Sequence, residues 1–180
     1  MNKNSIQYTM NSGGANGSDQ IFGEYAIKYG IGKINHYWYK KPNPHSKPED
    51  QISEEEYQEG IQMIHRANKT LKRKGIEKYM HLLARNWLQV KNSESIFAIG
   101  TINGKQVNGG TGWAVQMGID EGKSVYVFDQ EKCKWYFWNR DFEVCNTPIL
   151  TKNYAGIGTR EINENGIKAI ENLYKRTFLF

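Results

Sequence analysis

Three short glycine-containing segments carry the residue types that could bind a phosphate group. They are residues 12–19 (SGGANGSD), 108–112 and 156–160, and each follows a predicted strand and precedes a predicted helix. Glycine lets backbone N–H groups approach an anion closely, and the N-terminus of the following helix adds the positive end of its dipole. In a doubly wound sheet such loops gather at the carboxyl edge, where ligands bind. The three loops together therefore predict one site for an anionic ligand.

Charged side chains near these loops extend the prediction. Arg85 and Arg160 are candidate phosphate clamps, because a guanidinium offers a planar fork to two oxygens, although either one alone could equally form a surface ion pair. Asp19 is expected to cap the helix that it begins, with acceptance of a ribose hydroxyl as the alternative. Glu161 could pair with Arg160. Hydroxyl donors come from Ser12, Ser18, Thr111 and Thr159.

The sequence argues against several other kinds of site. No loop fits GxGxxG or GxxxxGK[ST], so neither a standard dinucleotide fingerprint nor a nucleoside triphosphatase is supported. The four histidines and two cysteines lack metal-ligand spacing, so we expect no metal and no cofactor. We also expect Cys133 and Cys145 to be free thiols in a reducing compartment.

Alternating strand and helix patterns must position the three loops. We predict strands at 6–10, 34–39, 95–99 and 124–128, and a last one opened by 148–150. Helices are predicted to follow the first loop, to run from the Ser53/Glu56 capping box to Lys74 before Gly75, and to cover 79–88, 113–119 and 162–178. This alternation predicts a single α/β domain over residues 1–180, Rossmann-like, with a mostly parallel sheet and helices on both faces.

Aromatic and basic segments outside this pattern have their own interpretations. Three prolines within 42–48 predict a loop at about 40–52 that could act as a lid, and 134–138 predicts an edge hairpin at about 133–147. Trp38 could stack on a base, with core packing as the alternative. The basic residues of 69–74 are interpreted as a solvated helix end. Trp135 and Trp138 suggest single-stranded DNA, but packing against a partner subunit is favoured, and we expect a dimer or higher homo-oligomer.

Overall charge favours an anionic partner without requiring nucleic acid. The chain has 180 residues with a net charge of +5, which suits small phosphate ligands equally well. It has no apolar leader and no apolar run of eighteen residues, so we expect a soluble cytoplasmic protein with no membrane partner.

Two motifs resemble a known superfamily. SGGANGSD resembles the Ser-Gly-Gly-x-x-Gly-x-Asp signature of the Rossmann-like SLOG superfamily, which includes the LOG phosphoribohydrolases, the DNA-processing protein A fold and nucleotide-sensing domains of anti-phage systems. NGGTGWAVQ, residues 108–116, is similar to the LOG pattern Pro-Gly-Gly-x-Gly-Thr-x-x-Glu, and Arg85-Asn86 resembles a phosphate-gripping arginine of these folds. The resemblance covers most of the chain but excludes the proline-rich loop and 134–138.

Departures from the LOG pattern imply binding without turnover. The glutamate that resembles the catalytic acid/base is Gln116 here, and an amide cannot move a proton at neutral pH, where such catalysis contributes about 10²- to 10⁴-fold. Trp113 replaces the threonine and could stack on a base or close the pocket. The resemblance implies a binder of a phosphate-bearing nucleotide or nucleotide-derived signal, such as a cyclic ADP-ribose isomer or a cyclic nucleotide. A phage sponge for an immune second messenger is one concrete version.

Two alternatives stay open at this point. One is a nucleoside 5′-monophosphate phosphoribohydrolase in which Glu161 or Asp19 takes the missing role, and the other is a single-stranded DNA-binding protein, although a nucleic-acid partner is not the favoured interpretation. The ligand-binding residues that we predict are Ser12, Gly13, Gly14, Ala15, Gly17, Ser18, Asp19, Trp38, Arg85, Asn86, Gly109, Gly110, Thr111, Gly112, Trp113, Gln116, Gly158, Thr159, Arg160 and Glu161, with no catalytic residue.

Overall fold

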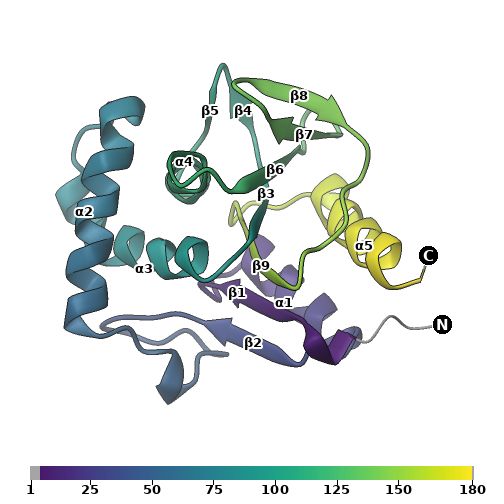
Figure 1. Ribbon diagram of the computed structural model, residues 1–180, viewed down its shortest axis with the longest axis horizontal. Coiled ribbons are helices and arrows are strands. Elements are labelled where there is room, and N and C mark those ends of the chain that lie inside the picture. The colour runs from purple at the N-terminus through teal and green to yellow at the C-terminus, as the bar shows by residue number, and fades with distance from the viewer. Residues whose placement is uncertain (1–4, 180) are drawn as a thin grey trace.

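A seven-stranded sheet forms the centre of the computed structural model, which describes residues 5–179 (Figure 1). The strand order is β2-β1-β9-β3-β6-β7-β8, in which the first five strands are parallel and the last two form an antiparallel edge hairpin. This arrangement confirms the predicted α/β class with a mostly parallel sheet. The strands are β1 (Thr9–Ser12), β2 (Lys33–His36), β3 (Ser95–Gly100), β6 (Ser124–Asp129), β7 (Lys134–Trp138), β8 (Phe142–Cys145) and β9 (Asn153–Gly158).

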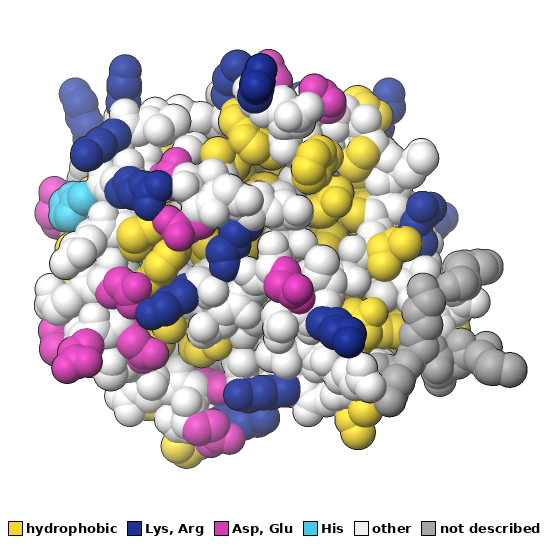
Figure 2. All heavy atoms as spheres, viewed as in Figure 1, with side chains coloured by type: hydrophobic (Ala, Val, Ile, Leu, Met, Phe, Trp, Pro, Cys, Tyr) yellow, Lys and Arg dark blue, Asp and Glu magenta, His cyan; other side chains and the backbone are white. Residues whose placement is uncertain are grey.

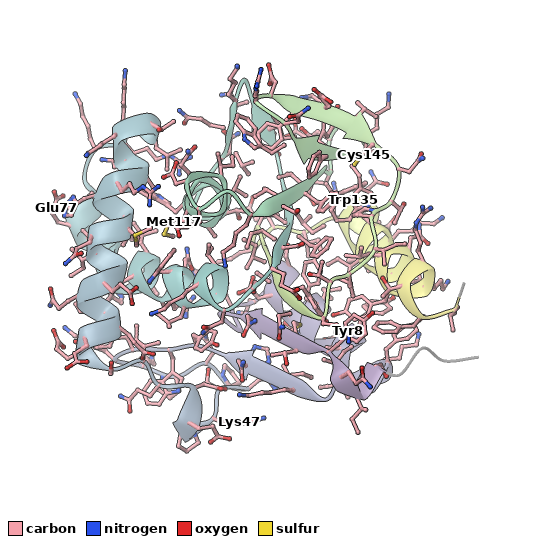
Figure 3. All side chains as sticks on the ribbon, in the orientation of Figure 1. Tyr8, Lys47, Glu77, Met117, Trp135 and Cys145 are labelled. Carbon is pink, nitrogen blue, oxygen red and sulfur yellow. The ribbon has the colours of Figure 1, made fainter. Side chains whose placement is uncertain are left out.

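Helices cover both faces of the sheet, as the sequence predicted. On one face α1 (Ser18–Lys28) and α5 (Glu164–Phe178) enclose a core around Phe22 and Tyr174. The other face carries α2 (Glu54–Leu71), α3 (Met80–Lys91) and α4 (Thr111–Asp120). Fully buried Met117 of α4 belongs to the core of this second face and lies on the side of its helix toward α2 (Figure 3). Among the helices in residues 5–179, none is long and apolar enough to span a bilayer.

Shorter elements complete the chain. They are the 3₁₀ turns η1 (Ser5–Gln7), η2 (Pro48–Asp50) and η3 (Ile76–Tyr79), and a small hairpin of β4 (Ile102–Asn103) and β5 (Gln106–Val107). We had expected the second glycine loop to follow β3 directly. The β4–β5 hairpin instead stands between β3 and the loop that leads into α4. Buried Asp129 at the end of β6 fixes the start of the hairpin by accepting a hydrogen bond from the Ile102 N–H at 3.0 Å.

Several predicted strand boundaries were wrong, because local hydrogen bonds replace the sheet ladder. The first strand begins at Thr9, since η1 occupies residues 5–7. The second ends at His36 instead of reaching residue 39; beyond it Trp38 forms only an isolated bridge with Gln51. Residues 148–150 do not open the last strand, because the Leu150 N–H donates to the Thr177 hydroxyl of α5 at 3.0 Å.

Helix α2 also ends earlier than predicted, at Leu71 instead of Lys74. The Asn68 side chain accepts from the Arg73 N–H at 2.8 Å and donates to the Arg73 carbonyl at 3.0 Å. Lys72 adopts a left-handed conformation with φ of 53°. Because Asn68 satisfies both backbone groups of Arg73, the chain turns away from the helix axis.

The edge hairpin packs its aromatic residues inward. Trp135 is buried and meets Phe128 edge to face at 5.5 Å, while Trp138 contacts Phe142 at 5.0 Å. Trp135 and Cys145 lie on the side of the hairpin that faces α5 (Figure 3). Cys133 and Cys145 are both free thiols. The predicted subunit interface at this hairpin stays a prediction.

Candidate ligand-binding site

The three glycine loops meet at one cavity of about 500 Å³. The first loop contributes Ala15 and Asp19, the second contributes residues 108–111, and the third contributes residues 158–160. The first loop follows β1, the third follows β9, and the second follows the β4–β5 hairpin, which comes after β3. Because β9 lies between β1 and β3 in the sheet, the three loops lie close together. The volume falls within the range of small-molecule sites.

The opposite wall is formed by α3 and the segment before it. Ile76, Tyr79, Leu82 and Leu83 make this wall largely apolar, and polar residues follow along α3. The cavity therefore offers an apolar side and a cationic side. Its lining residues that the sequence interpretation missed are Arg73, Lys74, Gly75, Ile76, Tyr79, Leu82, Leu83, Gln89, Asn108, Ala114 and Ile157.

The structure brings together only part of the predicted set. The predicted residues that line the cavity are Ala15, Asp19, Arg85, Asn86, Gly109, Gly110, Thr111, Trp113, Gly158, Thr159 and Arg160. Those outside its lining are Ser12, Gly13, Gly14, Gly17, Ser18, Trp38, Gly112, Gln116 and Glu161.

The N–H groups of Gly13, Gly14 and Ala15 in the first loop donate to acceptors within the protein. One Asp19 carboxylate oxygen accepts from the N–H of Gly13 at 3.2 Å and from that of Ala15 at 3.4 Å. The Ser12 hydroxyl accepts from the Gly14 N–H at 3.2 Å. For Gly13 and Gly14 this differs from the expectation that the glycine amides of this loop face a ligand. Asp19 closes the loop instead of capping α1, whose N-cap is Gly17 without a side-chain hydrogen bond.

Glycines of the first and third loops allow the two backbones to touch. A Cβ atom at Gly17 would lie 2.6 Å from the Arg160 Cα, and one at Gly158 would lie 2.6 Å from the Ser18 hydroxyl oxygen. The Ser18 hydroxyl donates to the Thr159 carbonyl at 2.7 Å. Gly158 stands at the end of β9 itself and not in the loop that follows. These glycines therefore serve close packing, which holds the two loops at a fixed separation.

The second loop alone has glycines that face open space. A Cβ at Gly109 or Gly110 would meet no atom within 4 Å. Among the described residues, the N–H groups of Gly109, Gly110 and Thr111 donate to no protein acceptor, and they lead into the N-terminus of α4. A helix start with free N–H groups and an open approach is suited to an anion.

Arg73 holds this second loop in place. Its guanidinium donates to the Gly109 carbonyl at 2.6 Å and to the Val107 carbonyl at 2.7 Å, and it lies 5.5 Å above the Trp113 ring. Burial lowers the pKa of Arg73. The sequence interpretation had placed this residue on a solvated helix end. The signal that was available is Asn68, which ends the helix early and turns Arg73 toward α4.

Arg85 is a buried cation whose hydrogen-bonding capacity is not fully used. It is 8% exposed, its Nε has no acceptor, and within residues 5–179 it forms no salt bridge. Burial lowers its pKa, the Asp19 carboxylate opposes this shift, and nearby Arg160 adds to it. Because buried polar groups are normally paired, an unpaired guanidinium in a cavity wall indicates a place for an anion.

Asp19 and Gln89 complete the polar corner around Arg85. A Cβ at Gly13 would lie 2.8 Å from the Gln89 Nε2, 3.2 Å from Asp19 and 3.3 Å from the Arg85 Cζ, so the three side chains converge. Burial raises the pKa of Asp19, and the attraction of Arg85 opposes it. The Gln89 Oε1 is buried without a donor. This corner can therefore accept and donate hydrogen bonds to a polar ligand.

Three other predicted residues are occupied elsewhere. Gln116 is buried and donates to Asp120 of its own helix at 2.8 Å. The backbone N–H of exposed Glu161 donates to the Thr159 hydroxyl at 3.2 Å, and in the described part of the chain Glu161 forms no ion pair with Arg160. The indole of Trp38 donates to a carbonyl of the proline-rich loop at 2.8 Å.

Comparisons with known proteins add no family to this description. Comparisons with protein-family models, with curated proteins and with solved structures each found no match. Over residues 5–179 no group of three or more His, Cys, Asp or Glu side chains is placed to hold a metal ion.

Proposed function

We propose that the cavity binds a phosphate-bearing nucleotide or a nucleotide-derived signalling molecule without consuming it. The observation that carries the proposal is Arg85, a buried guanidinium with an unpaired Nε in the wall of a cavity where Arg160 and the start of α4 also lie. Cations and free N–H groups would hold the phosphate. The apolar wall around Leu82 and Leu83 would accept a base or another flat apolar group.

The carboxylates around the cavity favour binding over hydrolysis. Asp19 is the one carboxylate among the described lining residues, and one of its oxygens already holds the first loop. Gln116, at the position that resembles a catalytic glutamate, lies outside the lining and pairs with Asp120. The SLOG resemblance supports a more specific version of the proposal, in which the protein sequesters a messenger such as cyclic ADP-ribose, as a phage sponge would do.

Native mass spectrometry of freshly purified protein tests this proposal, followed by incubation with a nucleotide panel and chromatography. We expect a bound species that is recovered unchanged after heat release. Arg85→Gln should abolish binding, whereas Arg176→Gln, an exposed arginine of α5, should leave it intact. Absence of any bound or retained nucleotide would contradict the proposal.

The enzymatic alternative rests on Asp19. Burial raises the pKa of its carboxyl, which is the direction that a general acid needs, and the residue lines the cavity. If the protein is a phosphoribohydrolase, chromatography will show free base and ribose phosphate, and Asp19→Asn will stop their formation. Recovery of intact nucleotide from the wild type would exclude it.

The single-stranded DNA alternative has less support. Of the two residues that would stack on bases, Trp135 is buried against Phe128, and Trp138 is partly buried against Phe142. Figure 2 shows Lys and Arg side chains scattered among Asp and Glu on the visible face, without a continuous basic stripe. A DNA affinity that falls steeply with salt concentration would restore this alternative.

A further inference from the structure

A second cavity of about 490 Å³ adjoins the first. Leu82, Arg85 and Arg160 line both cavities, so the two arginines stand at the junction between them. The remaining wall comes from His81 of α3 and from residues 39–43, which begin the proline-rich loop. This loop lies outside the superfamily resemblance.

The second cavity is strongly basic. Lys40, Lys41, Arg85 and Arg160 line it, and no carboxylate is among its described lining residues. In the described part of the chain none of these four side chains forms an ion pair within 4.0 Å. Glu54 attracts Lys40 from outside the lining and accepts a hydrogen bond from the Tyr39 hydroxyl. Positive charge concentrated in this way attracts an anion.

Several contacts fix the loop that carries the two lysines. The Asn43 side chain donates to the Gly13 carbonyl of the first glycine loop. Buried Asp50 accepts from the His36 N–H at 3.1 Å and from the Lys47 N–H at 3.2 Å, which ties the far end of the loop to β2. Lys47 marks this end in Figure 3. The backbone at Lys40 and Lys41 is thus held beside the junction.

We propose that the ligand carries a second phosphate group, which enters this second cavity toward Lys40 and Lys41 while Arg85 and Arg160 grip the phosphate at the junction. This inference rests on the proposed nucleotide-binding function and narrows its ligand class. Nucleoside diphosphates and pyrophosphate-linked nucleotide conjugates share the required chemistry. A nucleoside monophosphate would fill the main cavity alone.

Titration calorimetry with the four common nucleoside 5′-monophosphates and their 5′-diphosphates tests the inference. For the base that binds, we expect the second phosphate to tighten binding by at least about tenfold, because hydrogen bonds between charged groups are stronger than those between neutral groups. The double variant Lys40→Ala/Lys41→Ala should lose this gain and keep the monophosphate affinity. The matched control is Lys134→Ala/Lys168→Ala. It removes two lysines from a separate cavity between the edge hairpin and α5, so it should keep the tighter binding of the diphosphate.

The outcomes separate the inference from the function on which it rests. Equal affinities for mono- and diphosphate, or an unchanged gain in the Lys40/Lys41 variant, would overturn the second cavity's role while nucleotide binding stands. No binding of any nucleotide would overturn both. If adenine nucleotides are the ones that bind, a comparison of ADP-ribose with ADP distinguishes the two ligand classes. Tighter binding of ADP-ribose would identify the ligand as a pyrophosphate-linked conjugate, and weaker binding would identify it as a nucleoside diphosphate with a free terminal phosphate.

Discussion

Gly17 lies directly against the main chain of Arg160, so the first and third loops of the candidate site are packed backbone to backbone. Gly17 has φ of 88°, and an added Cβ would come within 2.6 Å of the Arg160 Cα. The spacing of the two loops, and with it the position of the Arg160 side chain at both cavities, depends on the missing side chain at this one residue.

Gly17→Ala should therefore destabilise the fold severely. Alanine would combine the strain of a backbone conformation that glycine alone adopts readily (φ 88°, ψ −127°) with a steric clash against main-chain atoms that cannot move aside, for a total loss of at least about 2 kcal/mol in the free energy of unfolding. Urea denaturation measures this loss. Gly104→Ala is the control, since Gly104 has φ of 59° but open space around it and should lose only about 1 kcal/mol. Equal losses in the two variants would show that the packing of the two loops contributes nothing.

Gly110→Ala should separate binding from stability. Gly110 has helical φ and ψ of −60° and −33°, and an added Cβ would meet no protein atom within 4 Å. The free energy of unfolding should change by less than about 0.5 kcal/mol. The methyl group would stand where a bound anion approaches the start of α4, so nucleotide affinity should fall at least about tenfold, or 1.4 kcal/mol.

Calorimetry with the nucleotide found by mass spectrometry checks this second prediction. Gly122→Ala, just beyond the other end of α4, should keep full affinity, because Gly122 is not among the residues that line either cavity. Unchanged affinity in Gly110→Ala would move the anion away from α4 and leave the arginine pair as its binding site.

The contribution of the Asp19 carboxyl to the free energy of unfolding should decrease as the pH rises. Burial raises its pKa from the ordinary 3.8, so the folded state holds its proton more tightly than the unfolded state does. The stabilisation is complete below the unfolded pKa and is lost as the pH rises through the folded pKa. The free energy of unfolding of the wild type minus that of Asp19→Asn should therefore fall as the pH increases from about 3.8. Denaturation across a pH series measures the difference, and a rise would mean that the attraction of Arg85 outweighs burial.

The order of strands and helices could be predicted because it depends on local hydrophobic periodicity. Glycine clusters after the first strand, before α4 and near the end of β9 also predicted that three loops meet at one edge, and residues of all three loops line the main cavity. The insertion of β9 between β1 and β3 could not be predicted, since strand order depends on contacts between residues far apart in the chain.

The role of each glycine was harder to predict than its presence. Gly17 and Gly158 are needed for close packing, whereas Gly109 and Gly110 face open space, and nothing in the sequence distinguishes the two pairs. The same holds for charges: Arg73 and Lys74 are neighbours in one basic run, yet only Arg73 donates to the carbonyls of the second loop. What a residue touches depends on where the helix before it ends.

Nucleotide binding should require the two-pronged hydrogen bonding of the Arg73 guanidinium and not its positive charge alone. Its guanidinium bridges the carbonyls of Val107 and Gly109, and a lysine at this position would keep the charge but lose the fork. Arg73→Lys should therefore lower the free energy of unfolding by about 1–2 kcal/mol, through the lost hydrogen bonds to the exposed Gly109 carbonyl and the partly buried Val107 carbonyl. Nucleotide affinity should fall at temperatures where the variant is still folded, because the second loop loses its anchor.

Exposed Lys69 of the same basic run is the control, and Lys69→Met should change neither the free energy of unfolding nor the nucleotide affinity. If Arg73→Lys binds nucleotide as the wild type does, the residue contributes only positive charge to the cavity, and the geometry of the second loop must be held by Trp113 and α4 themselves.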